Sequence, residues 1–250
     1  MSPAHARDAL TARPIAHRGL HDAARGVIEN TAGAVTAAIG RGYGIEVDVQ
    51  ISADGEAMVH HDDALGRLTD GAAPLATLTA AELVRVPFRA APERMMRLGE
   101  LLDLVGGRVA LLIEIKSRFD GDLRLARRCA QVLAGYTGPC GVMSFDPAVL
   151  VDLRRSSPQL TRGVVAERRF AAPGWTSPAA MHTFILAHLL HAWRTRPHFL
   201  AYRVDDLPAP ASHLARAIGV PILTWTVRTE DQRARAAQWA DQMIFEGFVP

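Results

Sequence analysis

Short apolar segments alternate with longer segments of helical pattern along most of the 250-residue chain. Strands that alternate with helices favour βα units and a parallel sheet. The expected strands cover residues 15–17, 45–49, 58–61, 109–115, 141–145, 163–165, 199–203, 222–227 and 242–245. The expected helices cover residues 31–41, 98–105, 123–133, 147–156, 178–194, 211–218 and 229–240.

About eight parallel strands in about 250 residues favour a closed α/β fold, the (β/α)8 TIM barrel. Residues 1–250 show no internal repeat and no linker, so we expect a single domain. The strand count is nine, one too many, and the connector Ser52–Glu56 is too short for a helix. The strands on either side of it form either a local hairpin or an irregular excursion. Residues 167–198 are the least regular part and predict a second excursion from the minimal barrel.

The charge composition excludes several kinds of partner. The chain has 28 basic and 26 acidic residues and no long basic run, so nucleic-acid binding is not expected. The N-terminal segment lacks the apolar stretch of a signal peptide, and nothing approaches the ~20 apolar residues of a membrane span. We therefore expect a cytoplasmic protein.

One apolar strand carries two carboxylates, Glu46 and Asp48, two residues apart. Residues i and i+2 of a strand share a face, so both would point to the barrel axis while Val47 and Val49 face the helices. Two inward carboxylates are costly unless a cation lies between them or basic side chains pair with them. A structural ion pair is the alternative to a metal site.

A second apolar strand places Glu114 and Lys116 on one face, again near its C-terminal end. Active sites of (β/α)8 barrels are built at that end of the strands. The pair alone could simply neutralise itself, but together the two strands supply three carboxylates and an ammonium. A set of oxygen ligands without cysteine suits Mg²⁺ or Ca²⁺ better than Zn²⁺.

Histidines end two further strands. His17 is followed by Arg18 and Gly19, and a guanidinium beside a glycine suits a phosphate group. His60 and His61 precede Asp62 and point to opposite faces, so one of them can enter a site. Two imidazoles on separate strand ends are able to act as acid and base on a phosphorus ester.

These segments resemble the glycerophosphodiester phosphodiesterase family, whose fold is a phospholipase-C-like TIM barrel. In family order, the matching segments are IAHRG, ENT, IEVDVQISADG, VHHDDALGRLT, LLIEIKS, MSFDP and LTWTV. The resemblance implies a hydrolase of lipid metabolism that converts a small glycerophosphodiester to glycerol phosphate and an alcohol. It also implies one divalent cation, Mg²⁺ or Ca²⁺, with Mn²⁺ as a further candidate.

The resemblance also implies roles for individual residues. Glu46, Asp48 and Glu114 correspond to metal ligands, and His17 and His61 to the acid–base pair. The positions implied for phosphate and substrate contacts are Arg18, Lys116, Glu29, Asn30 and Trp225, the last as a wall against the glycerol or alcohol group. In the implied reaction the glycerol 2-hydroxyl attacks first and water then opens a cyclic phosphate.

The last strand departs from the family pattern. Phe245-Glu246-Gly247-Phe248 stands where Thr-Asp-x-Pro is common, Arg228 where Asn is usual, and Leu68 where Thr is frequent. These changes leave the expected metal and histidine set intact and affect the rim of the site.

Three alternatives remain open on the sequence. The same site could cleave a lysophospholipid in phospholipase-D style, with the apolar helix at 178–194 covering an acyl chain. The chain could be a phosphate-ester binding module without catalysis. It could also be a homo-oligomer whose interface uses that helix.

Overall fold

The strands form one closed barrel. The structure, a computed structural model, describes residues 3–168 and 180–250. The strands are β1 (Ile15–Ala16), β2 (Gly44–Ile51), β3 (Ala57–Val59), β4 (Leu111–Ile115), β5 (Cys140–Ser144), β6 (Thr161–Ala166), β7 (Phe199–Arg203), β8 (Ile222–Val227) and β9 (Gln242–Phe245). All except β3 pair in parallel with their neighbours, and β1 joins β2 on one side and β9 on the other. The predicted (β/α)8 barrel is confirmed.

The ninth predicted strand is the second arm of a hairpin. β3 pairs antiparallel with the extended end of β2, with Val49 opposite Val59 and Ile51 opposite Ala57. The connector turns through Gly55, whose φ is +80°. Of the two interpretations that the sequence left open, the hairpin is correct.

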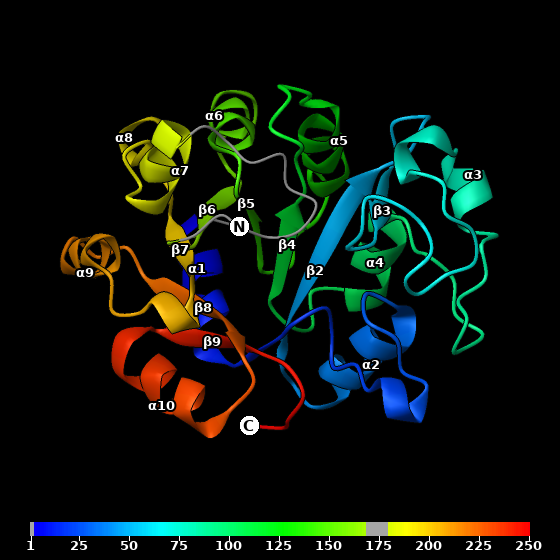
Figure 1. Ribbon diagram of the computed structural model, residues 1–250, viewed down its shortest axis with the longest axis horizontal. Helices are drawn as coiled ribbons and strands as arrows, with labels where there is room; N and C mark the ends of the chain where they lie inside the picture. The colour runs from blue at the N-terminus through cyan, green and yellow to red at the C-terminus, as the bar shows by residue number, and fades with distance from the viewer. Residues whose placement is uncertain (1–2, 169–179) are drawn as a thin grey trace.

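The helices surround the strands (Figure 1). They are α1 (Pro3–Ala12), α2 (Ala32–Gly40), α3 (Ala80–Leu83), α4 (Leu98–Val105), α5 (Arg124–Leu133), α6 (Pro147–Ser156), α7 (Ala180–Ala187), α8 (Ala192–Thr195), α9 (Pro210–Ala217) and α10 (Glu230–Trp239). Side chains cap the starts of several helices. Thr79 and Glu82 form a capping box at α3, and Asp146 accepts a hydrogen bond from the Ala148 amide at α6.

The main apolar core lies between the barrel wall and the helices. Val47 and Val49 pack there with residues of α4 such as Leu98 and Leu101, as the strand pattern predicts. The helix α1 was not predicted. It contacts β5, β6 and β9, and its Leu10 packs on Phe199 at the start of β7. The N-terminal end of the barrel is therefore covered, and the opposite end is left for a site.

The excursion at 167–198 differs from the expectation where the structure describes it. The single helix expected over 178–194 is wrong, because α7 and α8 are separate helices. The chain leaves the helical conformation at Leu189, whose φ is +56°, and the Leu190 amide donates to the Ile185 carbonyl. Residues 169–179 of this excursion lie outside the described residues.

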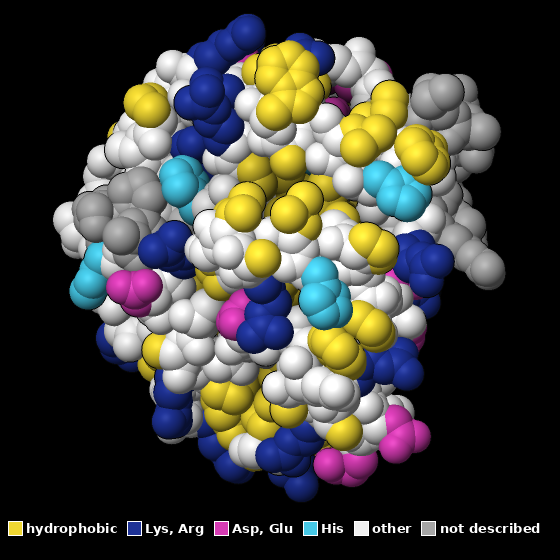
Figure 2. All heavy atoms as spheres, turned by 90° about the vertical axis from the view of Figure 1, so that its left-hand side faces the viewer, with side chains coloured by type: hydrophobic (Ala, Val, Ile, Leu, Met, Phe, Trp, Pro, Cys, Tyr) yellow, Lys and Arg dark blue, Asp and Glu magenta, His cyan; other side chains and the backbone are white. Residues whose placement is uncertain are grey.

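The side of the molecule formed by α7, α8 and α9 exposes hydrophobic side chains in separate groups with basic residues between them (Figure 2). The large ones on these helices or next to them in the chain are Phe184, Leu190, Trp193, Leu214 and Ile218. Among the described residues no helix combines the length and the apolar character that crossing a membrane requires.

Candidate functional site

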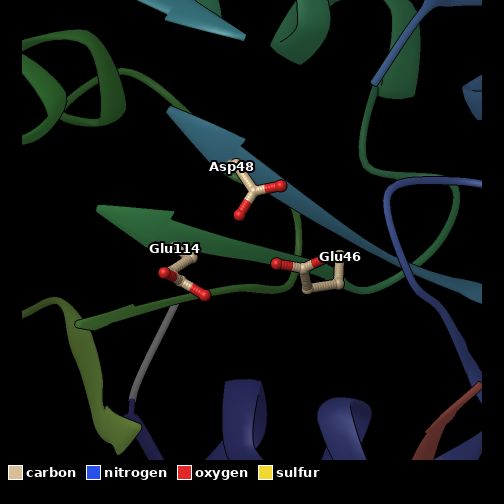
Figure 3. Close-up of side chains that lie close together, drawn as sticks. All are labelled: Glu46, Asp48 and Glu114. Atoms are coloured by element: carbon tan, nitrogen blue, oxygen red, sulfur yellow. The ribbon is translucent and has the colours of Figure 1, made fainter. Parts of the chain in front are cut away.

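Three carboxylates meet inside the barrel. Glu46 and Asp48 project from β2 and Glu114 from β4, and parallel pairing places Asp48 directly beside Glu114. One oxygen from each residue lies within 4.8 Å of the others, and all three side chains are buried. Figure 3 shows the three carboxylates turned toward one another from the two strands. The convergence that the i, i+2 spacing predicts is present.

The carboxylates do not share the same electrostatic environment. Burial raises the pKa of Glu46 well above its ordinary value, and the charges on Asp48 and Glu114 raise it further. Burial also opposes ionisation of Asp48, but Lys116 and Arg18 outweigh it and hold the pKa of Asp48 well below its usual range. The Lys116 ammonium lies 2.7 Å from a carboxylate oxygen of both Asp48 and Glu114.

Arg18 approaches the carboxylates through a left-handed turn after β1. Its φ is +55°, its amide donates to Glu46 Oε2 at 3.0 Å, and its Nε lies 3.2 Å from Asp48 Oδ2. Gly19 continues the turn with φ +79°, and a Cβ at this position would lie 2.8 Å from atoms of Ala34. The His-Arg-Gly sequence therefore needs its glycine both for the turn and for the close approach to α2.

His17 contacts a carboxylate on each side. Its Nδ1 lies 2.6 Å from Glu246 Oε2, and its Nε2 lies 3.9 Å from Glu46 Oε2. Burial lowers the pKa of His17, although the hydrogen bond to Glu246 opposes this effect. Arg228 donates to the same oxygen of Glu246 at 2.8 Å.

Glu246 contacts the site, and the sequence interpretation did not include it among the site residues. Burial alone would raise its pKa, but the contacts with His17 and Arg228 lower it to about 2. A signal was present, because Glu246 occupies the place of the family's acidic residue after the last strand. That position was assigned to the rim, whereas its carboxylate reaches a site imidazole.

His61 lines the same cavity and has a carboxylate partner of its own. Its Nδ1 lies 2.8 Å from Asp62 Oδ1. His60 points the other way and is buried, with its ring 6.4 Å from that of Phe88. His61 is therefore the histidine of this pair that lines the cavity.

Glu29 and Asn30 lie behind the residues that line the cavity. The Asn30 side chain donates to Asp48 Oδ2 at 3.0 Å and accepts from the Asp48 amide at 3.2 Å. Glu29 Oε1 accepts from Arg18 Nη1 at 2.7 Å. Both residues contact the site side chains, and neither lines the cavity itself.

The site opens into a cavity of about 360 Å³. Trp225 lines it and packs edge-to-face on Phe145, with ring centroids 5.6 Å apart, while its Nε1 donates to the Ala201 carbonyl. The further lining residues beyond the predicted set are Met143, Phe145, Val165, Glu167, Arg203, Asp205, Thr226, Arg228 and Ile244. The cavity thus joins a charged floor to an aromatic wall.

The arrangement suits chemistry on a phosphate ester. Carboxylate oxygens that share a buried site suit a hard divalent cation. Cationic groups beside them, Arg18 and Lys116, suit the oxygens of an anionic ester. The imidazoles of His17 and His61 each have one nitrogen bound by a carboxylate, and both rings line the cavity. This arrangement suits proton transfer.

Comparison with known proteins points in the same direction. The sequence model of the glycerophosphoryl diester phosphodiesterase family matches residues 17–249. The chain is similar to a glycerophosphodiester phosphodiesterase from Caldanaerobacter subterraneus subsp. tengcongensis, with 30% identity over 182 residues, which are 69% of this chain and 73% of that protein.

Two solved structures share the fold. A phosphodiesterase from Oleispira antarctica, in complex with the product sn-glycerol-3-phosphate, superposes with a TM-score of 0.76 at 22% identity, covering 95% of this chain and 94% of its own. A glycerophosphodiester phosphodiesterase from Thermotoga maritima superposes with a TM-score of 0.69 at 22% identity, covering 92% of each chain.

Proposed function

The chain belongs to the glycerophosphoryl diester phosphodiesterase family, and on this premise we propose that it hydrolyses a glycerophosphodiester to glycerol phosphate and an alcohol. The family makes the chain an enzyme, a phosphoric diester hydrolase. One observation supports this reaction most directly. Three buried carboxylates converge at one cavity, and two histidines that are each bound by a carboxylate line the same cavity.

Glu46, Asp48 and Glu114 would hold one divalent cation, Mg²⁺, Ca²⁺ or Mn²⁺. Their donor atoms are close enough to share an ion, and the charges on Asp48 and Glu114 add to burial in raising the pKa of Glu46. Arg18 and Lys116 bring two positive charges to three carboxylates, which leaves one negative charge for a cation. When bound, such an ion polarises a non-bridging phosphate oxygen as a Lewis acid.

Arg18 and Lys116 are the proposed phosphate contacts. Both are held by Asp48, so their charged groups stay at the floor of the cavity. There they stabilise the charge that develops on the phosphoryl oxygens. Asn30 and Glu29 support this arrangement from behind, Asn30 through Asp48 and Glu29 through Arg18.

His17 and His61 are the proposed acid–base pair. One imidazole accepts the proton of the glycerol 2-hydroxyl as that oxygen bonds to phosphorus, which gives a cyclic phosphate that water then opens to glycerol phosphate. The other donates a proton to the alcohol oxygen as its bond to phosphorus breaks. Glu246 and Asp62 engage Nδ1 of the two rings, which leaves Nε2 of each for this exchange. Each proton transfer of this kind contributes about 10²–10⁴-fold to the rate.

The size of the cavity favours a small diester over a lysophospholipid. About 360 Å³ lies at the lower end of the range of small-molecule sites, which is about 300–1,000 Å³. Trp225 and Phe145 form the apolar wall on which the glycerol or alcohol group would pack. We also propose that residues 1–250 act as one catalytic domain in the cytoplasm, within lipid metabolism.

A substrate panel tests the function. The purified chain would be treated with EDTA, and Mg²⁺, Mn²⁺ or Ca²⁺ would be restored singly before glycerophosphodiesters and lysophospholipids are added. We expect glycerol phosphate and free alcohol from the small diesters, with an ion and not without one. Absence of hydrolysis across the panel would instead support the non-catalytic binding module. Size measurement in solution would decide the homo-oligomer alternative.

A further inference from the structure

Arg67 lies beside the site without lining its cavity, and its guanidinium binds two carboxylates from different loops. Nε donates to Asp62 Oδ2 at 2.6 Å. Nη1 and Nη2 donate to the two oxygens of Glu29 at 3.1 and 2.7 Å. All three nitrogens of the guanidinium are therefore engaged. The contacts tie the loop after β1 to the loop after β3.

Each of these carboxylates in turn holds a residue of the proposed reaction. The second oxygen of Asp62 binds Nδ1 of His61 at 2.8 Å. Glu29 accepts from Nη1 of Arg18 at 2.7 Å, on the same oxygen that receives Nη2 of Arg67. Arg67 is thus linked through Asp62 to the His61 imidazole and through Glu29 to the Arg18 guanidinium.

The contacts are stronger than those of an ordinary surface ion pair. Exposed pairs contribute little unless they are bidentate or belong to a network, and Arg67 satisfies both conditions. Glu29 is only 13% exposed; burial would raise its pKa, but Arg67 and Arg18 lower it to about 2. Arg89 and Asp70, at 3.4 Å and mostly exposed, form a contrasting isolated pair nearby in the sequence.

An arginine is needed here for geometric reasons. The planar fork of a guanidinium holds a carboxylate with two parallel bonds while a third nitrogen reaches another acceptor. Asp62 uses one oxygen for Arg67 and the other for His61, so its own orientation is fixed from both sides. A lysine at position 67 has one nitrogen and cannot reproduce this pattern.

We propose, on the premise of the hydrolytic function above, that Arg67 is a positioning residue that fixes the His61 ring through Asp62 and the Arg18 guanidinium through Glu29. It touches no reacting atom. Its effect on the rate comes from the orientation of the two groups that do.

Double-mutant cycles test this assignment. We would measure kcat and KM for glycerophosphocholine with Mg²⁺ in wild type, Arg67→Met, Asp62→Asn, Glu29→Gln and the two double variants that contain Arg67→Met. We expect Arg67→Met to lower kcat by about 10- to 100-fold, since small misplacements of reacting groups cost up to about 10². In the double variants, the kcat loss of Arg67→Met should not add to that of Asp62→Asn. The rise in KM of Arg67→Met should not add to that of Glu29→Gln.

Controls separate positioning from folding. Arg89→Met removes an exposed pair outside the site and should leave kcat and KM unchanged. Arg67→Lys keeps the charge, and we expect it to fold with a wild-type melting temperature and still lose most of the kcat. If Arg67→Met does not fold, Arg67→Lys with the same partner variants takes its place in the cycles.

The outcomes are distinct. An active wild type with Arg67→Met or Arg67→Lys within about twofold of it in kcat and KM would overturn the positioning role. Losses that add fully to those of Asp62→Asn and Glu29→Gln would also overturn it. A wild type without activity on any diester would refute the proposed function instead. In that event, NMR would still test the positioning role. If the ¹⁵N chemical shifts of the His61 ring in Arg67→Lys equal those in wild type, the positioning role is contradicted.

Discussion

The His17 imidazole and the Glu246 carboxylate, 229 residues apart in the sequence, are joined by a hydrogen bond of 2.6 Å. Closure of the barrel creates this contact, since β1 and β9 are neighbours. A carboxylate on Nδ1 fixes the ring orientation and the tautomer, which leaves Nε2 for the cavity. The same relationship recurs between His61 and Asp62, and each carboxylate also binds an arginine.

Replacement of Glu246 should therefore act on the rate. Glu246→Gln keeps the shape but removes the charge that orients His17, and we expect kcat to fall by about 10²-fold. Steady-state kinetics check this, with Glu230→Gln on the exposed start of α10 as the matched control. Equal kcat values for Glu246→Gln and wild type would show that His17 does not need this partner.

The two histidines should be separately required. His17→Ala and His61→Ala should each lose at least about 10²-fold in kcat, the lower bound for general acid–base help. Circular dichroism and melting temperature should stay near those of wild type. His213→Ala, an exposed position on α9, serves as the control. A variant of either site histidine with near-normal kcat on the true substrate would remove that residue from the mechanism.

The carboxylate cluster should bind an ion that stabilises the fold. At an Mg²⁺ concentration of 100 times Kd, binding adds about 2.7 kcal/mol to the free energy of unfolding. For a chain of this size each 1 kcal/mol corresponds to about 2–4 °C in melting temperature. Thermal unfolding with and without Mg²⁺ should show this rise in wild type. Glu114→Gln should lose most of it; an equal rise in that variant would place the ion elsewhere.

Acid should weaken the fold through Glu29 and Glu246. Both carboxylates have a pKa near 2 in the folded protein because arginine and histidine contacts outweigh burial. Unfolded glutamates titrate near 4.3, so unfolding takes up protons as the pH falls. The stabilisation is complete above about pH 5 and is lost progressively toward pH 2. Urea unfolding at several pH values should show a flatter curve for Glu29→Gln than for wild type, and a parallel curve would contradict this origin.

Much of the fold was readable from local pattern. The alternation of strands and helices predicted the barrel, and the period of two in β2 predicted which side chains face the axis. Helix α1 was not predicted, because Ala6 and Leu10, the buried apolar residues of its described part, are too few to show a helical period. The break at Leu189 was not predicted, because a residue with left-handed backbone conformation inside an apolar segment does not change the hydrophobic periodicity.

The site was predicted where its residues lie at strand ends, and missed where loops supply the partners. Glu46 and Asp48 share a face of β2 by spacing alone, as Glu114 and Lys116 do at the end of β4. The contact of Glu246 with His17 depends on barrel closure, and that of Arg67 with Glu29 on how two loops fold over the same end. Spacing along the sequence contains no information about such contacts.

The most direct measurement is anomalous diffraction from crystals soaked in Mn²⁺ and sn-glycerol-3-phosphate. We predict one strong peak in contact with oxygens of Glu46, Asp48 and Glu114, with the phosphate beside Arg18 and Lys116. A cluster without a peak, with Lys116 still bridging Asp48 and Glu114 and the phosphate elsewhere, would contradict the assignment of this site as a metal-dependent phosphodiesterase centre.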